Sequence, residues 1–297
     1  MKLSIFNRLS VDMRRKSVSA LLTLLLCAPA VSTATAFNNL NHWLEHAPLG
    51  EAADWTAKAG IQSMVEDNGH GRTGYLGPGY GGQEYDAEAI YVNKSGNLLE
   101  IAVVTGMSPD PTHTYGPGDI AIDLGYIQGG PASFEIGIRT TGAHAGEIYQ
   151  VGADGWDYGL WDTNGNHVPG SPDPAHPTSM NSSDKNKLLG SLDDNHFYYG
   201  EAKYGATSPS QLGKHSGDMH YLIAVRIDLN NSDLGFLTGG LGGAFLAHWT
   251  MNCANDIVEV GLPPAGAAAS VPEPAALLLA LSGLIGLIGS RRFRNAA

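Results

Sequence analysis

Three carboxylates recur at every second position in the string Glu84-Tyr85-Asp86-Ala87-Glu88. On a β-strand, alternate residues point to one face of the sheet, so Glu84, Asp86 and Glu88 would share a face. Paired carboxylates can act as nucleophile and acid/base in glycoside hydrolysis, and a retaining pair lies about 5–5.5 Å apart. Alternate strand positions are roughly 6.6 Å apart and the outer two roughly 13 Å, so the side chains would have to converge.

This string resembles the Glu-x-Asp-x-Glu signature of laminarinase-like retaining glycoside hydrolases. The resemblance implies Glu84 as the nucleophile and Glu88 as the acid/base residue. Tyr85 and Ala87 stand where that family has aliphatic residues, and the aromatic surroundings of the family motif are missing. Short motif matches often arise by chance. We therefore expect a strand on an acidic surface, predict no catalytic residue and expect the protein not to be an enzyme.

Acidic residues in two parts of the chain could instead supply the oxygen ligands that calcium prefers. These candidates are Asp86, Glu88, Asp119 and Asp123. The sequence has no Asp-x-Asp-x-Asp-Gly loop, and surface acidity is the simpler explanation. The eleven histidines show no paired metal-ligand spacing. We predict no metal site and no cofactor, with calcium left open as an alternative.

Trp156, Tyr158 and Trp161 form an aromatic cluster in a stretch rich in glycine and aspartate. If exposed, these rings could stack on the apolar faces of sugar rings. If buried, they are core residues, as large aromatic side chains usually are. The sequence leaves both interpretations open.

Charge is distributed unevenly along the 297 residues. Residues 37–270 carry 27 acidic and 9 basic side chains, a net charge of −18, whereas both ends are basic. Such an acidic body repels phosphate backbones, which excludes nucleic acid as a partner. Cys27 lies near the N-terminus and only Cys253 lies in the body, so we expect no intrachain disulfide in the mature protein.

The pattern of the body predicts an all-β fold, a single β-sandwich or jelly roll over residues 37–262. Short apolar runs alternate with turns rich in Gly, Asn, Asp and Pro. The expected strands are 85–92, 98–106, 120–124, 134–140, 147–151, 220–229 and 244–251, the first two forming a hairpin. Single helical turns are expected at 40–47 and 208–212, and a polar surface loop at 168–187.

The N-terminal segment 1–36 is typical of a secretory signal peptide. A basic stretch ends with Arg14-Arg15-Lys16, an apolar run follows over 18–30, and Ala34-Thr35-Ala36 provides a small-x-small cleavage site. The mature chain is therefore expected to begin at Phe37, after export by the general secretion machinery.

The C-terminal segment combines three features in a fixed order. A Pro/Ala/Gly linker (263–270) leads to Val271-Pro272-Glu273-Pro274, then to a 15-residue apolar run over 275–289. That run would span about 22 Å as a helix, a marginal length for crossing a membrane. Arg291, Arg292 and Arg294 follow it and should stop transfer on the cytoplasmic side. We expect a single transmembrane helix here.

Residues 271–297 resemble the PEP-CTERM protein-sorting tail. Proteins with that tail are substrates of exosortase, a membrane transpeptidase of Gram-negative bacteria that produce exopolysaccharide and biofilm. The resemblance implies that the helix anchors a precursor in the inner membrane and is cut near Pro272–Pro274. The protein would then reach the cell surface or the extracellular matrix.

A further motif, His248-Trp249-Thr250-Met251-Asn252-Cys253-Ala254-Asn255-Asp256, ends the body. It resembles the His-Trp-Thr-Met-x-Cys-Gly-Asn-Asp segment of a group of exosortase-dependent surface proteins. Ala254 replaces the glycine of that segment, which raises the question of whether a special backbone angle is kept. Cys253 could be a buried, inert thiol, or it could link the chain to a partner.

These features together predict an exported surface or matrix protein with a structural or adhesive role in exopolysaccharide or biofilm. One alternative is a calcium-assisted carbohydrate-binding module that uses the aromatic cluster and some of the acidic residues. A glycan hydrolase that uses Glu84 and Glu88 is the other alternative. Exosortase, the secretion machinery and exopolysaccharide are the expected partners.

Overall fold

The computed structural model describes residues 36–50, 54–66, 82–110, 115–127, 132–159, 176–215, 217–230 and 244–262. The predicted signal peptide up to Thr35, the predicted linker and sorting tail, and Trp161 lie outside the described residues. Within the described residues, no helix is long and apolar enough to cross a membrane. The expected transmembrane helix thus stays a prediction.

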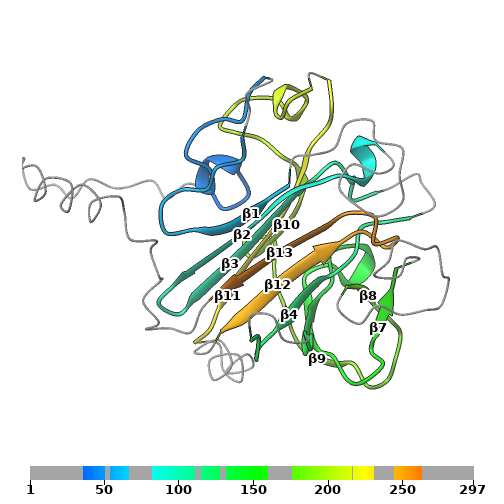
Figure 1. Cartoon of the computed structure of the whole chain (residues 1–297). Coiled ribbons are helices and arrows are strands. Elements are labelled where there is room, and N and C mark those ends of the chain that lie inside the picture. The colour runs from blue at the N-terminus through cyan, green and yellow to red at the C-terminus, as the bar shows by residue number, and fades with distance from the viewer. Residues whose placement is uncertain are drawn as a thin grey trace, which may run out of the picture. The chain divides into compact units, whose positions relative to one another are not determined.

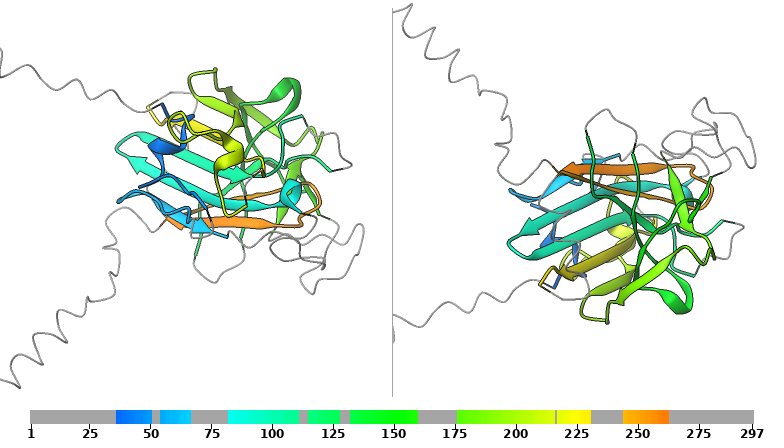
Figure 2. Two further views of the ribbon diagram at one scale, coloured as in Figure 1. Left: turned by 90° about the horizontal axis from the view of Figure 1, so that it is seen from above. Right: turned by 90° about the horizontal axis from the view of Figure 1, so that it is seen from below.

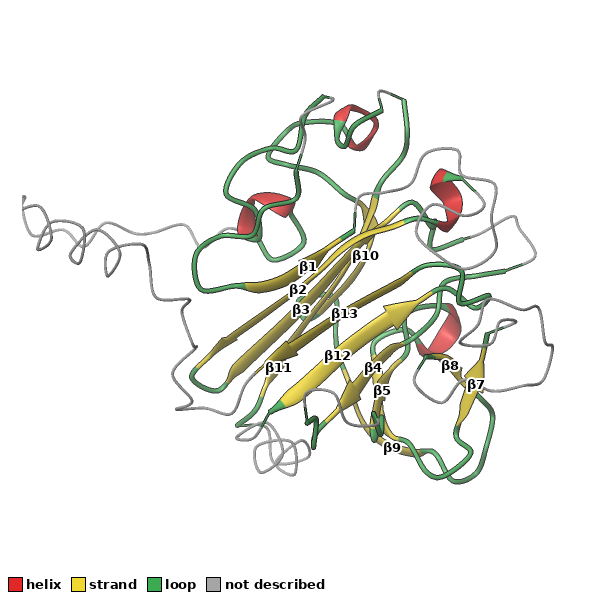
Figure 3. Cartoon of the chain, in the orientation of Figure 1, coloured by secondary structure: helices red, strands yellow, loops and turns green. Residues whose placement is uncertain are grey.

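The described body is all-β and consists mainly of two antiparallel sheets, which confirms the predicted fold class (Figure 1 and Figure 3). The five-stranded sheet has the order β1-β2-β3-β11-β10. Its strands are β1 (Gln62–Val65), β2 (Ala87–Ser95), β3 (Leu98–Thr105), β10 (Phe197–Glu201) and β11 (Tyr221–Asp228).

The six-stranded sheet has the order β13-β12-β4-β5-β6-β9. Its strands are β4 (Ile120–Asp123), β5 (Ile136–Ile138), β6 (Glu147–Gln150), β9 (Lys187–Ser191), β12 (Phe245–Thr250) and β13 (Ile257–Leu262). A small third sheet pairs β7 (Trp156–Tyr158) with β8 (Pro177–Met180). Short 3₁₀ turns complete the described elements: η1 (Leu40–His42), η2 (Gln83–Tyr85), η3 (Gly142–His144) and η4 (Pro209–Gln211).

The main core lies between the two large sheets. Alternate residues of β3 (Leu99, Ile101 and Val103) enter this core, as do Ile223 and Val225 of β11. The intervening residues of both strands face a second apolar cluster on the outer side of the five-stranded sheet. Burial on both faces explains why these strands are nearly continuous apolar runs in the sequence. β13 lies beside β1 and β2 of the other sheet, as the orange strands in Figures 1 and 2 show.

The outer cluster is covered by the N-terminal segment and by the chain around η4. Trp43 and Trp55 are fully buried there together with Leu212. Backbone hydrogen bonds from Leu40 to Lys203 and from Gly213 to Pro48 join the two segments. The single turns expected at 40–47 and 208–212 are confirmed as η1 and η4.

Two local predictions need correction. The expected hairpin exists and its second strand begins at Leu98 as predicted, but the first strand covers 87–95 instead of 85–92, so the turn is only Gly96-Asn97. The segment 168–187 is not a loop throughout, because β8 occupies residues 177–180. β8 pairs with β7, so tertiary pairing outweighs the low strand propensity of its sequence.

Candidate functional site

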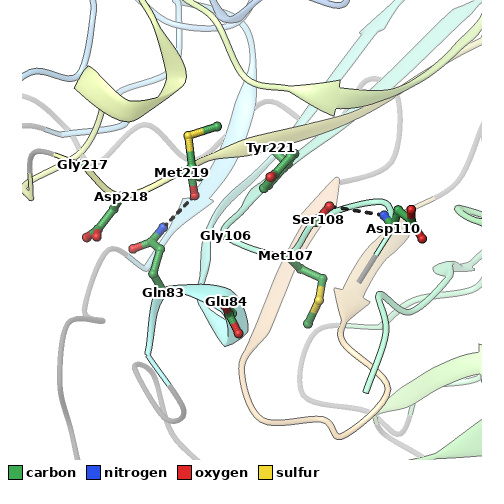
Figure 4. A pocket seen from close by; sticks show the side chains of 10 residues that line it. All are labelled: Gln83, Glu84, Gly106, Met107, Ser108, Asp110, Gly217, Asp218, Met219 and Tyr221. Carbon is green, nitrogen blue, oxygen red and sulfur yellow. Dashed lines mark hydrogen bonds between the residues drawn. The ribbon is translucent and has the colours of Figure 1, made fainter. Parts of the chain in front are cut away.

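A pocket of about 440 Å³ opens at one end of the five-stranded sheet (Figure 4). Because the strands are antiparallel, the start of β2, the end of β3 and the start of β11 meet there. The pocket is lined by residues 83–84, 106–108, 110, 217–219 and 221. This volume falls within the range of about 300–1,000 Å³ that is usual for small-molecule sites.

The wall formed by η2 depends on close backbone contact with β3. Gly106 follows β3 directly, and a Cβ atom at that position would lie 1.5 Å from the carbonyl oxygen of Gln83. Only glycine therefore allows η2 to rest on the end of the strand. The Thr105 hydroxyl donates to the Asp86 carbonyl at 2.6 Å and accepts the Met107 amide at 3.1 Å, which fixes this end of β3.

The Gln83 side chain joins the pocket to the buried residues behind it. Its Nε2 donates to Oε1 of Glu88 at 3.1 Å and to the Met219 carbonyl at 3.4 Å, the second contact being visible in Figure 4. On the opposite wall, the Asp110 amide donates to the Ser108 hydroxyl at 3.3 Å. The lining thus has side chains whose positions are set by hydrogen bonds.

Behind Gln83 lies a buried ion pair. Nε2 of His220 is 2.8 Å from Oε1 of Glu88, and each side chain is only 2 % exposed. Nδ1 of His220 is 3.2 Å from the Pro209 carbonyl oxygen in η4. Burial alone would lower the pKa of His220, but the hydrogen bond and charge of Glu88 raise it above the ordinary value. The pair therefore fastens the η4 segment to β2.

A pair of carboxyl groups lies between the two large sheets. Asp86 and Asp256 are each 2 % exposed and share a hydrogen bond. Oδ2 of Asp256 accepts the Ala87 amide at 2.7 Å, and Oδ1 accepts the Ile257 amide at 2.9 Å. Burial is the main cause that raises the pKa of Asp256 to about 7. The pair joins the start of β2 to the start of β13.

The structure does not place the carboxylates of the string 84–88 on one strand face. Glu84 lies exposed in η2, Asp86 precedes β2, and Glu88 sits at a β-bulge between Ala87 and Ala89. The bulge turns Glu88 toward His220, while Asp86 contacts Asp256. Glu84 and Glu88 therefore do not form the close pair that the resemblance to retaining glycoside hydrolases implies.

The four calcium candidates are also separated. Asp119 accepts the amides of Thr140 at 3.1 Å and Met180 at 2.8 Å and contacts Arg139, and burial raises its pKa. Asp123, at the other end of β4, accepts the amides of Gly125 and Ser133. No group of three His, Cys, Asp or Glu side chains among the described residues could hold a metal ion. These carboxylates hold loops in place instead.

Two residues of the aromatic cluster, Trp156 and Tyr158, belong to an apolar core on the outer side of the six-stranded sheet. Trp156 is 7 % exposed, and its Nε1 donates to the Phe134 carbonyl at 2.8 Å. Tyr158 is half-buried and packs against the same cluster. Because Trp156 is almost fully buried, the structure favours the core interpretation over sugar stacking for this residue.

The motif at 248–256 ties several elements to the six-stranded sheet. His248 is fully buried, with Nδ1 2.8 Å from Oε1 of Glu259 and Nε2 3.0 Å from the Pro177 carbonyl oxygen. Nε1 of Trp249 donates to the Gly118 carbonyl at 3.0 Å. A Cβ atom on Gly118 would lie 2.1 Å from the Thr250 carbonyl oxygen, so this approach requires glycine. In this protein the motif therefore has a structural role, because it holds neighbouring segments against the six-stranded sheet.

Two positions of this motif answer questions left by the sequence. Cys253 is 5 % exposed in the main core, and burial raises the pKa of its thiol to about 11. The structure thus favours the buried, inert thiol. Ala254 has φ of 53°, so the left-handed backbone expected of a glycine is kept even though alanine occupies the position.

The sequence did not reveal the roles of Gln83 and His220. It also pointed to no separate role for Asp256. Gln83 and His220 lie far apart in the chain and in no spacing pattern, so only the fold brings them together with Glu88. Asp256 is the last residue of the motif at 248–256, and this motif was the one sequence signal that could have pointed to Asp256. Neither protein-family models nor curated proteins include a match to this chain.

Proposed function

We propose that the protein is exported, sorted by exosortase and displayed at the cell surface or in the extracellular matrix of a Gram-negative bacterium, with a structural or adhesive role. The observation that carries this proposal is the order of parts in the C-terminal tail: Val271-Pro272-Glu273-Pro274, the apolar run, and Arg291, Arg292 and Arg294 at the end. A signal-like segment at 1–36 precedes the acidic body. The membrane helix serves as a temporary anchor, and the tail is removed near Pro272–Pro274.

The contacts of the buried carboxylates in the β-sandwich favour a binding or structural role rather than catalysis. Its buried carboxylates are engaged by structural partners: Glu88 by His220, Asp119 by Arg139, and Glu100 by Arg226. Burial would raise the pKa of Glu100, but hydrogen bonds from His42 and Arg226 lower it to about 2. Groups used in this way stabilise loops and strands.

The two alternatives receive less support. A calcium-assisted carbohydrate-binding module would need its acidic residues together and its aromatic rings free, whereas Trp156 is buried and Asp119 and Asp123 hold separate loops. A retaining hydrolase would need Glu84 beside Glu88, and the two lie in different local structures. We propose no cofactor.

The sorting proposal is tested with the full-length protein expressed in its own host. The variant Pro272→Ala/Glu273→Gln/Pro274→Ala changes only the sorting motif, and Pro263→Ala/Pro264→Ala is the matched control in the neighbouring linker. We expect the motif variant to accumulate uncut in the inner-membrane fraction, while the control reaches the surface fraction as the wild type does. Surface display of the motif variant at the wild-type level would contradict exosortase sorting.

A further inference from the structure

The lining of the pocket at the end of the five-stranded sheet has a marked charge. Glu84 in η2, Asp110 after β3 and Asp218 before β11 bring carboxylates from three separate segments to one cavity (Figure 4). None of the described lining residues is Lys, Arg or His. Such a cavity concentrates cations and repels phosphates and uronic acids.

The same cavity also has an apolar part. Met107 and Met219 line it together with Tyr221, so thioether groups and an aromatic ring lie beside the carboxylates. Methionine adapts to irregular apolar surfaces, and a tyrosine ring suits the C–H face of a ligand. A hard cation such as Ca²⁺ would gain nothing from the thioether groups, whereas a small organic cation would contact both kinds of group.

The frame of the pocket is fixed before any ligand binds. η2 rests on Gly106 without room for a Cβ atom, and Gln83 is held by Glu88 and by the Met219 carbonyl. The ion pair of Glu88 with His220 is buried directly behind that glutamine. A fixed frame reduces the entropy lost on binding.

We propose that this pocket binds a small ligand carrying a protonated primary amine, with the ammonium group against the carboxylates of the lining and the carbon skeleton against the methionines. The ammonium group can belong to an amino sugar or to a lysine side chain. The proposal does not depend on the route by which the protein is exported.

The test measures binding to the purified full-length protein in mild detergent by isothermal titration calorimetry. Glucosamine and Nα-acetyl-lysine methylamide are the probes, and N-acetylglucosamine and the Nε-acetylated lysine compound are their matched neutral forms. We expect at least one amine to bind with a Kd of about 1 mM or lower, equivalent to about −4 kcal/mol. Acetylation removes the charge and should weaken that binding at least about tenfold. The probe that binds distinguishes sugar from peptide as the source.

Substitutions then locate the site. Glu84→Gln and Asp218→Asn should each weaken amine binding about three- to tenfold, because each removes one carboxylate from the lining. Asp228→Asn is the control: Asp228 pairs with Leu98 at the opposite end of β11, and its loss changes the net charge equally. Absence of binding by both amines, equal binding of the acetylated forms, or an equal effect of Asp228→Asn would each overturn the proposal. Failure here would leave the sorting test unaffected, since that test concerns only the tail.

Discussion

His220, directly before β11 of the five-stranded sheet, and His248, within β12 of the six-stranded sheet, are both buried between a glutamate and a proline carbonyl. His220 lies between Glu88 and the Pro209 carbonyl oxygen. His248 lies between Glu259 and the Pro177 carbonyl oxygen. The pKa of His220 is raised, and its protonated ring can donate to both oxygens at once, whereas a neutral imidazole has only one N–H group. Each histidine thereby fastens a peripheral segment, η4 or β8, to its sheet.

The two sites differ in how far their glutamates are buried. The Glu88 side chain is 2 % exposed, whereas that of Glu259 is 31 % exposed on the edge strand β13. Breaking a buried pair leaves an uncompensated group in a medium of low polarity, whereas water can replace a half-exposed partner. We therefore expect the two sites to differ in energy despite their similar hydrogen-bond geometry.

The pH dependence of stability extends this comparison to the acid pair between the sheets. The pKa of Asp256 is about 7 in the folded protein, above its ordinary value of 3.8. The folded state then binds more protons than the unfolded state, so the free energy of unfolding falls as pH rises from about 4 to 7, by up to about 4 kcal/mol. The raised pKa of His220 adds a further loss as pH rises above 6.5. Urea unfolding measured at intervals across this range tests the slope.

Asp256→Asn isolates the contribution of the acid pair. The variant should reduce the fall between pH 4 and 7 by the part that Asp256 contributes and leave the parts due to the raised pKa values of Asp119 and His220. The exposed variant Asp228→Asn should keep the wild-type slope. An unchanged slope in Asp256→Asn would show that the carboxyl pair is not the source.

Removing the charge of each glutamate tests the two histidine sites directly. Glu88→Gln should lower the free energy of unfolding at pH 6 by about 2–3 kcal/mol, the range for a buried hydrogen bond to a charged group. Glu259→Gln is its matched control and should lower that free energy by less than about 1 kcal/mol. Chemical denaturation gives both values. Equal losses in the two variants would mean that the exposure of the glutamate does not decide the energy.

The smallest effect concerns the turn that follows the His248 strand. Ala254 has a left-handed backbone, with φ of 53°, which is unfavourable for residues other than glycine. Ala254→Gly should raise the free energy of unfolding by about 1 kcal/mol by removing this strain. Ala102→Gly, in the middle of β3, should lower it by a similar amount or more. A loss of stability in Ala254→Gly would indicate that the methyl group contributes more by packing than it costs in strain.

Sequence patterns predicted the parts of the fold where the two faces of a strand differ or where both are apolar. The hairpin of β2 and β3 and the long strand β11 are examples, because runs of branched aliphatic residues determine their type. β1 was missed, since its four residues are all exposed and its pairing with β2 is a tertiary effect. β8 was missed for another reason: it is largely buried, but its sequence has low strand propensity and its pairing with β7 is a tertiary effect.

The candidate site was less predictable than the fold. Glu84 was identified, but for a catalytic pair that the turn η2 and the bulge at Glu88 prevent. Alternation of side chains holds only within a regular strand, and a single extra residue reverses the face. His220 joins Glu88 only because β11 lies beside β3 in the sheet, a pairing that no local pattern encodes.

The most direct test of the proposed function is intact mass spectrometry of the protein taken, without reductant, from the surface fraction of its native host. We expect a chain that begins at Phe37 and ends near Pro272, with any added mass revealing an attached glycan or lipid. Because Cys253 is buried, the mass should correspond to one chain and not change with thiol. A chain that still extends to Ala297 would contradict exosortase sorting and would leave a β domain attached to the membrane by its tail.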